Sequence, residues 1–495
     1  MDPVAFGRRV FVLGATAATL AASAPRPVAA PVRDPFTLGV ASGDPTPDGV
    51  VLWTRLAPDP LAPDGLGGMP DRTVPVGWEI AEDERFGRVV QRGVVDAVPD
   101  SAHTVHVEAV GLAPGRAYFY RFRAAGALSP AGRTRTAPAP GALTAVTTCV
   151  ASCANYPVGW FTAYRRLAED EPDLVLHLGD YQYEYPTPER SVRPVAGPET
   201  TGLAGYRQRY AQYRTDPDLQ AAHAVAPWLV VWDDHEVVDN WAGQATERGY
   251  PERRIAAFQA YYEHMPLRRT SVPHGLDLQL YRRIEWGALA TFHLMDTRQY
   301  RSDQACGDGM RVDCAARSDP SRSLPGAAQE QWLLAGFRST RVRWDVLGQQ
   351  VFFAERARAS DEAYAMDTWD GYVASRDRIT AGFADVRNAL VLTGDVHSHW
   401  ANELVRDGRV VGTELVSSSI TSGADGDAAT DHPDLRRNPH LRFRSNRRGY
   451  VRARYAADRV TADFRVVDAV TTPGAPVRTA ASFVIPDRQP GLNRV

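Results

Sequence analysis

The fold of this 495-residue chain is decided by the stretch Pro172-Asp173-Leu174-Val175-Leu176-His177-Leu178-Gly179-Asp180. The apolar run over residues 174–178 is typical of a strand buried on both faces of a mostly parallel sheet. Gly179 interrupts this strand, and Asp180 follows at its carboxyl end. Because ligands of open α/β sheets bind beyond the carboxyl ends of the strands, the stretch predicts a functional role for Asp180.

Other apolar runs also lead into polar side chains. The run over residues 143–146 leads to Cys153 and Asn155, and the run over residues 228–232 leads to Asp233-Asp234-His235-Glu236. The run over residues 290–295 leads to Asp296 and Arg298, and the run over residues 388–392 leads to Asp395, His397 and His399. Because parallel strands end on the same side of a sheet, we expect these groups to converge on one edge of one sheet. A thiol, carboxylates and imidazoles in one place are typical of a metal site.

Composition narrows the classes of function. The net charge of −3 gives no drive towards nucleic acid or an anionic membrane, and no nucleic-acid-binding module is expected. All 56 residues of the combined Lys and Arg total are arginine. The absence of lysine excludes a Gly-Lys-Ser/Thr phosphate loop, a Schiff-base lysine and a His-x-Lys phospholipase motif. We expect no transmembrane segment, because no run is long and apolar enough to span ~30 Å of hydrocarbon.

The amino terminus predicts export. Arg8-Arg9 precede a short apolar stretch over residues 14–22 and the small residues Ala29-Ala30. We therefore interpret residues 1–30 as a twin-arginine signal peptide. This interpretation predicts a secreted, periplasmic or cell-surface protein, which folds and takes up its metals before the twin-arginine export machinery moves it.

The four cysteines fit such an exported protein. Cys306 and Cys314 bracket a short polar loop, where a pair of thiols is expected to form a disulfide. Cys149 lies in an apolar strand and is expected to be a core residue. Cys153 differs from the other three, because the topology places it beside the other candidate ligands.

Chain length predicts two domains, because single hydrophobic cores stop growing at about 250–300 residues. Residues 34–138 are expected to form a fibronectin-like β-sandwich, because short alternating runs are separated there by Pro, Gly and Asp turns. Residues 112–120 resemble a sandwich corner in which a tyrosine hydroxyl bonds to the backbone. Residues 143–485 alternate strands with helical stretches, which predicts a layered α/β domain. The expected sandwich strands cover residues 36–40, 49–55, 74–80, 89–95, 104–110 and 117–122, and the expected helices cover 160–167, 255–264 and 327–337.

The candidate ligands differ in their chemistry. Cys153, as a thiolate, is a soft anionic ligand. Asp180 is expected to bind or bridge metals, and Tyr183, as a phenolate, is a hard ligand suited to ferric iron. Asp234 is the ligand candidate of its acidic cluster. His235 beside it can donate a proton to a leaving oxygen or stabilise the charged transition state.

Further polar residues are expected around these ligands. Asp395 and His397 alternate along an expected extended segment, so their side chains should point the same way, and His399 should continue that face. In contrast, His177 and His293 lie inside apolar strands and are predicted to be core residues. The residues expected to orient the ligands or meet the substrate are Asn155, Glu236, Asp239, Asn240 and His399.

Together these motifs resemble the PhoD-like family of alkaline phosphatases and phosphodiesterases, a variant of the calcineurin-like metallophosphoesterases. The likeness covers the mature chain, the leading β-sandwich and the signal peptide. It implies a calcineurin-like layered α/β domain preceded by the sandwich. The segments that carry it are residues 152–156, 179–185, 232–236, 295–298, 392–397, 418–423, 438–440 and 448–451.

The resemblance also implies a function and its cofactors. A secreted alkaline phosphatase or phosphodiesterase would hydrolyse phosphate mono- or diesters at an iron–calcium centre. Fe³⁺ would be held with help from Cys153 and Tyr183, and Ca²⁺ chiefly by carboxylates. His235 and Asp180 are the expected catalytic residues. The metal-binding set that the resemblance implies is Cys153, Asp180, Tyr183, Asp234, Asp395 and His397.

The same motifs are compatible with two alternative functions. The first is a phospholipase D that acts on phosphatidylcholine-type diesters, which the same centre could hydrolyse; release of choline would identify it. The second is a catalytically silent cell-surface binding protein. That alternative requires loss of the candidate ligands, which are all present in this chain.

Overall fold

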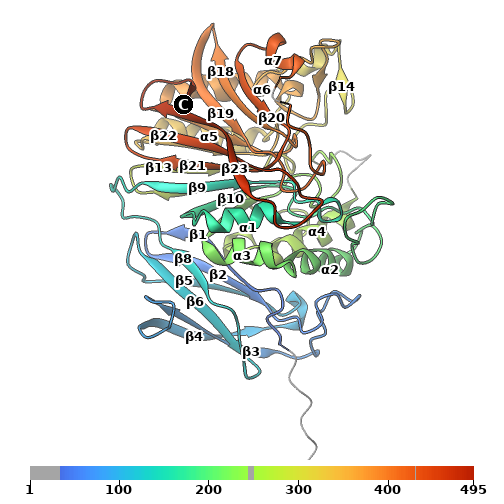
Figure 1. Ribbon diagram of the computed structural model, residues 1–495, viewed down its shortest axis with the longest axis vertical. Helices are drawn as coiled ribbons and strands as arrows, with labels where there is room; N and C mark the ends of the chain where they lie inside the picture. Colours follow the sequence, from blue (N-terminus) through green and yellow to red (C-terminus); the bar gives the residue numbers. More distant parts are fainter. Residues whose placement is uncertain (1–33, 244–249, 430) are drawn as a thin grey trace, which may run out of the picture. The chain divides into compact units, whose positions relative to one another are not determined.

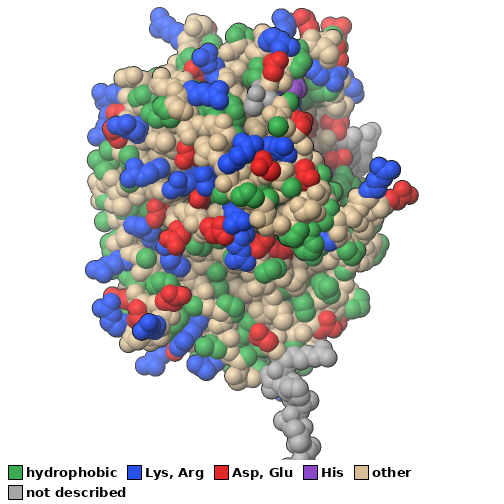
Figure 2. Space-filling model, viewed as in Figure 1, with side chains coloured by type: hydrophobic (Ala, Val, Ile, Leu, Met, Phe, Trp, Pro, Cys, Tyr) green, Lys and Arg blue, Asp and Glu red, His purple; other side chains and the backbone are tan. Residues whose placement is uncertain are grey.

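A computed structural model describes residues 34–243, 250–429 and 431–495 of the chain. Asp34–Val495 forms one compact unit. The proposed signal peptide lies outside the described residues, and the predicted domain boundary between residues 138 and 143 stays a prediction. Within the described ranges, no helix combines the length and the apolar character that crossing a membrane requires. Figure 2 shows basic and acidic side chains interspersed on the visible face.

The largest sheet of the described residues has ten strands, and its centre contains the predicted strand over residues 174–178. β9, β10 and β11 are parallel neighbours, in which Val175 of β10 pairs with Cys149 on one side and Trp228 on the other. The strands, in spatial order, are β24 (Asn493–Arg494), β23 (Val477–Pro486), β22 (Arg459–Val467), β21 (Arg448–Tyr455), β9 (Val146–Ala151), β10 (Leu174–Leu178), β11 (Trp228–Val231), β1 (Val40–Thr46), β2 (Gly49–Arg55) and β5 (Thr104–Val110).

A second sheet has seven strands, of which β13, β15, β17 and β19 are parallel. It contains two of the strands that lead into polar motifs, so the prediction of a single sheet is wrong. The strands, in spatial order, are β12 (Arg282–Trp286), β13 (Ala290–Leu294), β15 (Trp344–Gly348), β17 (Ala389–Thr393), β19 (Arg409–Val416), β18 (His399–Arg406) and β20 (Leu441–Ser445).

The two large sheets pack face to face. A side-chain carbon on Gly348 of β15 would lie 3.4 Å from Leu178 of β10, so the sheets approach closely there. On the other face of β10, Nε2 of His177 lies 2.8 Å from the phenol oxygen of Tyr164 in the helix α1 (Thr162–Glu169). Figure 1 shows α1 next to β10. A strand between a sheet and a helix is apolar on both faces, and this pattern does not reveal whether one sheet or two is present.

The helices follow the predictions only in part. α1, α4 (Pro251–His264) and α5 (Ala327–Ser339) lie within a few residues of the predicted stretches. α2 (Leu203–Arg214) was missed, because its buried residues include arginine, glutamine and tyrosine and give no apolar stripe. The other α-helices of the described residues are α3 (Pro217–Val225), α6 (Val373–Gly382) and α7 (Pro433–Arg437), and β14 (Met310–Arg311) pairs with β16 (Tyr364–Ala365) in a two-stranded sheet.

The amino-terminal β-rich part packs a five-stranded sheet against β1, β2 and β5. Its apolar core includes Leu52, Ile80 and Phe122. The backbone N–H of Ala113 donates to the phenol oxygen of Tyr118 at 3.0 Å, which confirms the tyrosine corner. The five strands are β4 (Val89–Ala97), β3 (Val74–Ala81), β6 (Ala117–Ala124), β7 (Ala127–Leu128) and β8 (Gly132–Arg135).

The first strand begins later than predicted and joins the amino-terminal part to the parallel centre of the ten-stranded sheet. Residues 36–40 were expected to be a strand, but Gly39 has a φ of 69° and its N–H donates to the carbonyl of Phe36 in a turn. The strand β1 therefore starts at Val40. Gly43 of β1 pairs with Trp228 of β11 in a parallel arrangement.

Other predictions about single residues are confirmed. Cys306 and Cys314 form a disulfide, and Cys149 is a buried free thiol. His177 and His293 are both 1% exposed. His293 lies 3.0 Å from the carboxylate of Asp345, so its polar ring is satisfied within the core.

Burial of His177 predicts a loss of stability in acid. Burial lowers the pKa of His177 to about 3, whereas an unfolded histidine has a pKa of about 6.5. The unfolded chain therefore binds a proton below pH ~6.5 that the folded chain does not bind until about pH 3. We expect this group to reduce the free energy of unfolding by about 1.4 kcal/mol per pH unit between those values. Denaturant unfolding at pH 7, 6, 5 and 4 measures this slope, which His177→Asn should reduce; an equal slope in the variant would contradict it.

Candidate metal centre

Loops from both large sheets bring the candidate ligands together. The thiol of Cys153, the carboxylate of Asp180 and the imidazole of His397 offer ligand atoms that lie within 4.8 Å of one another. Asp180, Asp234 and His235 form a second such group with the same limit of 4.8 Å. Asp180 belongs to both groups, and its Oδ1 is buried without a hydrogen-bond partner. Burial of a carboxylate oxygen without a partner is unfavourable, so this donor set fits bound cations.

Tyr183 lies between the members of the first group. Its phenol donates a hydrogen bond to Oδ2 of Asp180 at 2.9 Å, and Nε2 of His397 lies 3.3 Å from the phenol oxygen. Ser422 donates to the same phenol oxygen at 2.7 Å. Ser422 lies within a family motif, but a serine outside the strand ends carries no signal of its own, so its contact with Tyr183 cannot be predicted from the sequence.

Several ligand candidates adopt strained backbone. The φ angles of Cys153, Asp180, Asp395 and His397 are 58°, 54°, 65° and 50°. Such left-handed conformations cost of order 1–3 kcal/mol each and persist where the surroundings fix them. The expectation of an extended segment at residues 395–397 is therefore wrong. The N–H of Val396 donates to the carbonyl of Gly394 at 2.8 Å, so a tight turn presents these side chains.

The loops after β10 and β11 touch each other. A side-chain carbon on Gly179, where φ is 96°, would lie 2.6 Å from the backbone nitrogen of Asp233, so only glycine fits there. Glu236 crosslinks the same loops, because its carboxylate accepts from the N–H groups of Asp180, Tyr181 and Asp233 at 3.1, 2.6 and 2.9 Å. Glu236 thus orients the site through the backbone and belongs to neither donor group.

His235 is held in a defined orientation. Its Nδ1 lies 2.8 Å from Oε2 of Glu184, whose side chain is fully buried. Glu184 thereby leaves Nε2 as the free nitrogen of His235. Burial lowers the pKa of His235, but the charges of Asp234, Asp180 and Glu184 outweigh burial and raise it well above its ordinary value. The ring of His235 also contacts Tyr183 and Tyr185, with centroid distances of 4.1 and 5.3 Å.

Arg298 is the buried cation behind the acidic ligands. It is fully buried, and its Nη1 and Nη2 donate to the carboxylate of Asp367 at 2.9 and 2.8 Å. Its Nε donates to Asp233, and Nη2 lies 3.7 Å from Asp234. Although burial opposes ionisation, Arg298 lowers the pKa of Asp234 below its ordinary value. Burial raises the pKa of Asp395, and Asp233 raises it further.

Asp395, Asn155 and His399 are among the predicted residues that lie outside the two donor groups. Asp395 is half-buried and belongs to neither group among the described residues. Asn155 is also half-buried, and its carbonyl accepts from the hydroxyl of Thr421 at 2.7 Å. His399 is fully buried, and its Nδ1 accepts from the N–H of Ser418 at 3.0 Å.

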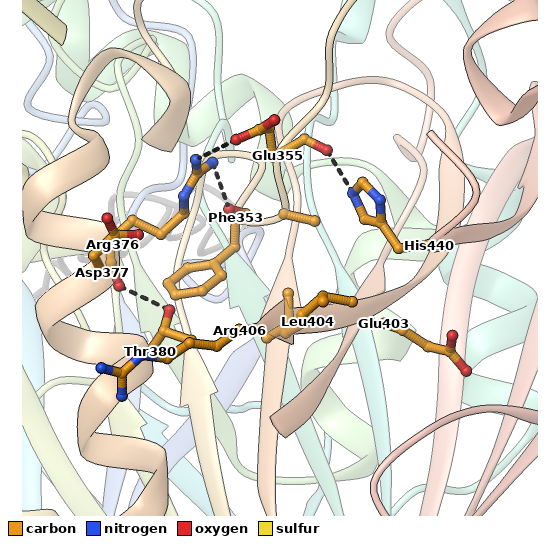
Figure 3. Close-up of a pocket in the computed structure, with 11 residues that line it drawn as sticks. Phe353, Glu355, Arg376, Asp377, Thr380, Glu403, Leu404, Arg406 and His440 are labelled. Atoms are coloured by element: carbon orange, nitrogen blue, oxygen red, sulfur yellow. Dashed lines mark hydrogen bonds and ion pairs between the residues drawn. The ribbon is translucent and has the colours of Figure 1, made fainter. Parts of the chain in front are cut away.

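A separate cavity of about 240 Å³ lies between α6, β18 and the loop after β15. Figure 3 shows that Arg376 bonds to Glu355 and that His440 bonds to the carbonyl of Glu355. None of the ligand candidates lines this cavity.

Comparison with known proteins identifies the family. Residues 148–464 match the PhoD-like phosphatase family, and residues 20–138 match the N-terminal domain of PhoD-like phosphatases. The chain belongs to the PhoD-like phosphatase family. It is 49% identical to alkaline phosphatase D of Bacillus subtilis strain 168, over 93% of this chain and 82% of the relative.

Solved structures agree with the family. A structure of PhoD matches with a TM-score of 0.90 and 48% identity, covering 94% of this chain and 92% of the other. A purple acid phosphatase from yellow lupin seeds matches with a TM-score of 0.55 and 12% identity, covering 90% and 73%, which supports the fold alone. The predicted fold class and family are confirmed, and this PhoD-like phosphatase is a phosphoric ester hydrolase.

The contact between Glu184 and His235 predicts a catalytic effect. Glu184→Gln removes the negative charge that orients and stabilises the protonated imidazole, so we expect kcat to fall by about 10–100-fold. Glu199→Gln is the control, because the Glu199 side chain is 45% exposed and pairs with Arg253. Steady-state hydrolysis of p-nitrophenyl phosphate measures both variants. An unchanged kcat in Glu184→Gln would show that the contact does not serve catalysis.

Proposed function

We propose that this PhoD-like phosphatase hydrolyses phosphate esters at a centre of two cations that share Asp180. Fe³⁺ would be held by Cys153, Tyr183 and His397 together with Asp180. Ca²⁺ would be held chiefly by carboxylates, those of Asp180, Asp234 and Asp395. The observation that carries the proposal is the membership of Asp180 in both donor groups, with a buried oxygen left without a partner.

The chemistry of the donors supports two unlike cations. A thiolate and a phenolate suit ferric iron, whereas a cluster of carboxylates suits the hard calcium ion. Burial raises the pKa of both Cys153 and Tyr183. Each is therefore protonated on its own, and ligation of a cation would displace its proton.

Different residues of the chain would have different roles in hydrolysis. Bound cations supply Lewis-acid polarisation of phosphoryl oxygens and a lowered pKa of water. His235, through its free Nε2, would donate a proton to the leaving oxygen while Glu184 holds its ring. Arg298 would keep Asp234 ionised, so that the ligand carries its charge before any cation binds.

We also propose that the enzyme is exported and that its substrates are phosphate mono- or diesters. The twin-arginine pattern at Arg8-Arg9 and the disulfide between Cys306 and Cys314 support an oxidising location outside the cytoplasm. Residues 34–138 would form a separate β-sandwich domain ahead of the catalytic domain at residues 143–485.

Substitution of the shared ligand tests this proposal. Asp180→Asn and Cys153→Ser should reduce turnover of p-nitrophenyl phosphate and of its bis-ester by at least ~10²-fold, the size that loss of even an indirect metal contact can reach. Asp427→Asn is the control, because Asp427 is exposed and bonds to Asn446 at 2.7 Å. Full activity of Asp180→Asn would place the centre elsewhere. Release of choline from phosphatidylcholine, faster than hydrolysis of the bis-ester, would instead favour the phospholipase.

A further inference from the structure

The disulfide loop is a fixed structure rather than a loose turn. Inside the loop, β14 pairs with β16 through Met310 and Ala365. The N–H of Met366 donates to the carbonyl of Gly309 at 3.0 Å. The apolar side chains of Ala305, Cys314 and Met366 pack together at its base. The loop therefore has a defined position relative to the segment that carries Asp367.

This loop reaches the candidate metal centre through Asn240. The side-chain amide of Asn240 donates to Oδ2 of Asp308 at 2.8 Å. The backbone N–H of the same residue donates to Oδ2 of the ligand candidate Asp234 at 2.7 Å. One asparagine thus connects a carboxylate of the disulfide loop to a carboxylate of the metal centre.

Asn240 is also held from a second direction. It has a φ of 50°, a left-handed conformation that asparagine adopts more readily than most residues with a side chain. Gln304, just before the disulfide, donates to the carbonyl of Asn240 at 2.8 Å. It also lies 2.8 Å from Asp367, the partner of Arg298. Asn240 is therefore contacted by Asp308 inside the disulfide loop and by Gln304 just before it.

We propose that Asp308 is a positioning residue for Asp234, acting through Asn240, and that the disulfide between Cys306 and Cys314 keeps Asp308 in place. This inference rests on the proposed function, because it takes Asp234 to be a ligand of Ca²⁺. An asparagine held by Asp308 would direct its N–H at Oδ2 of Asp234, and the orientation of the whole carboxylate, which belongs to one ligand group with Asp180, would depend on that hydrogen bond. Loss of the disulfide would let the loop sample other positions and loosen that orientation.

Calcium release from the holoenzyme tests the inference. Asp308→Ala should release Ca²⁺ into a fluorescent chelator about 10–100-fold faster than the wild type, the range found for loss of partners that orient metal ligands. Asp308→Asn keeps an oxygen that accepts from Asn240 and should stay within about twofold of the wild type. Asp313→Asn is the matched control, because Asp313 is an exposed acid in the same loop.

The double variant Cys306→Ser/Cys314→Ser tests the role of the disulfide. It should release Ca²⁺ as fast as Asp308→Ala while circular dichroism shows a folded protein. Release at the wild-type rate from the folded double variant would overturn the role of the disulfide.

Other outcomes separate this inference from the proposed function. Equal release from Asp308→Ala and the wild type would overturn the positioning role alone. Equally fast release from Asp308→Asn and Asp308→Ala would also overturn it, because the charge rather than the hydrogen bond would then matter. A wild-type enzyme that holds no calcium would overturn both the proposed function and this inference.

Discussion

The carboxylate of Asp180 is the constraint on which the rest of the site depends. It emerges from the central strand β10, belongs to two groups of potential ligands and has one buried oxygen without a partner. Contacts between the loops after β10 and β11 fix the position of this residue. Gly179 allows the loop to touch Asp233, and Glu236 accepts hydrogen bonds from both loops. These contacts fix the backbone at Asp180, so the fold itself sets the position of the proposed ligand.

The second requirement of the site is electrostatic balance. Buried carboxylates repel one another, and each would lose its charge if burial acted alone. Arg298 counteracts this loss, because it contacts Asp233 and Asp367 and approaches Asp234. Removal of one partner from such a buried network leaves an uncompensated charge, which typically costs 3–5 kcal/mol. Arg298 is therefore part of the site, although it offers no ligand atom.

The sequence predicted the candidate ligands better than it predicted the sheets, turns and hydrogen-bond partners around them. The strand at residues 174–178 and the juxtaposition of Cys153, Asp180, Asp234 and His397 follow from one physical fact, namely that apolar parallel strands end together. The same fact could not distinguish one sheet from two, because burial on both faces arises in either case. The backbone conformation at Asp395 and His397 could not be predicted from the sequence either, because strained turns depend on surrounding contacts. Ser422 and Glu184 were missed as partners because their roles depend only on three-dimensional proximity.

Anomalous diffraction from crystals of the holoenzyme would show whether two cations share Asp180. We expect an iron peak bound by the Cys153 thiolate and the Tyr183 phenolate, and a second cation near Asp234. The carboxylate of Asp180 should lie within coordination distance, ~2.0–2.6 Å, of both. Cations bound elsewhere, or an Asp180 carboxylate that contacts neither of them, would rule out a shared ligand.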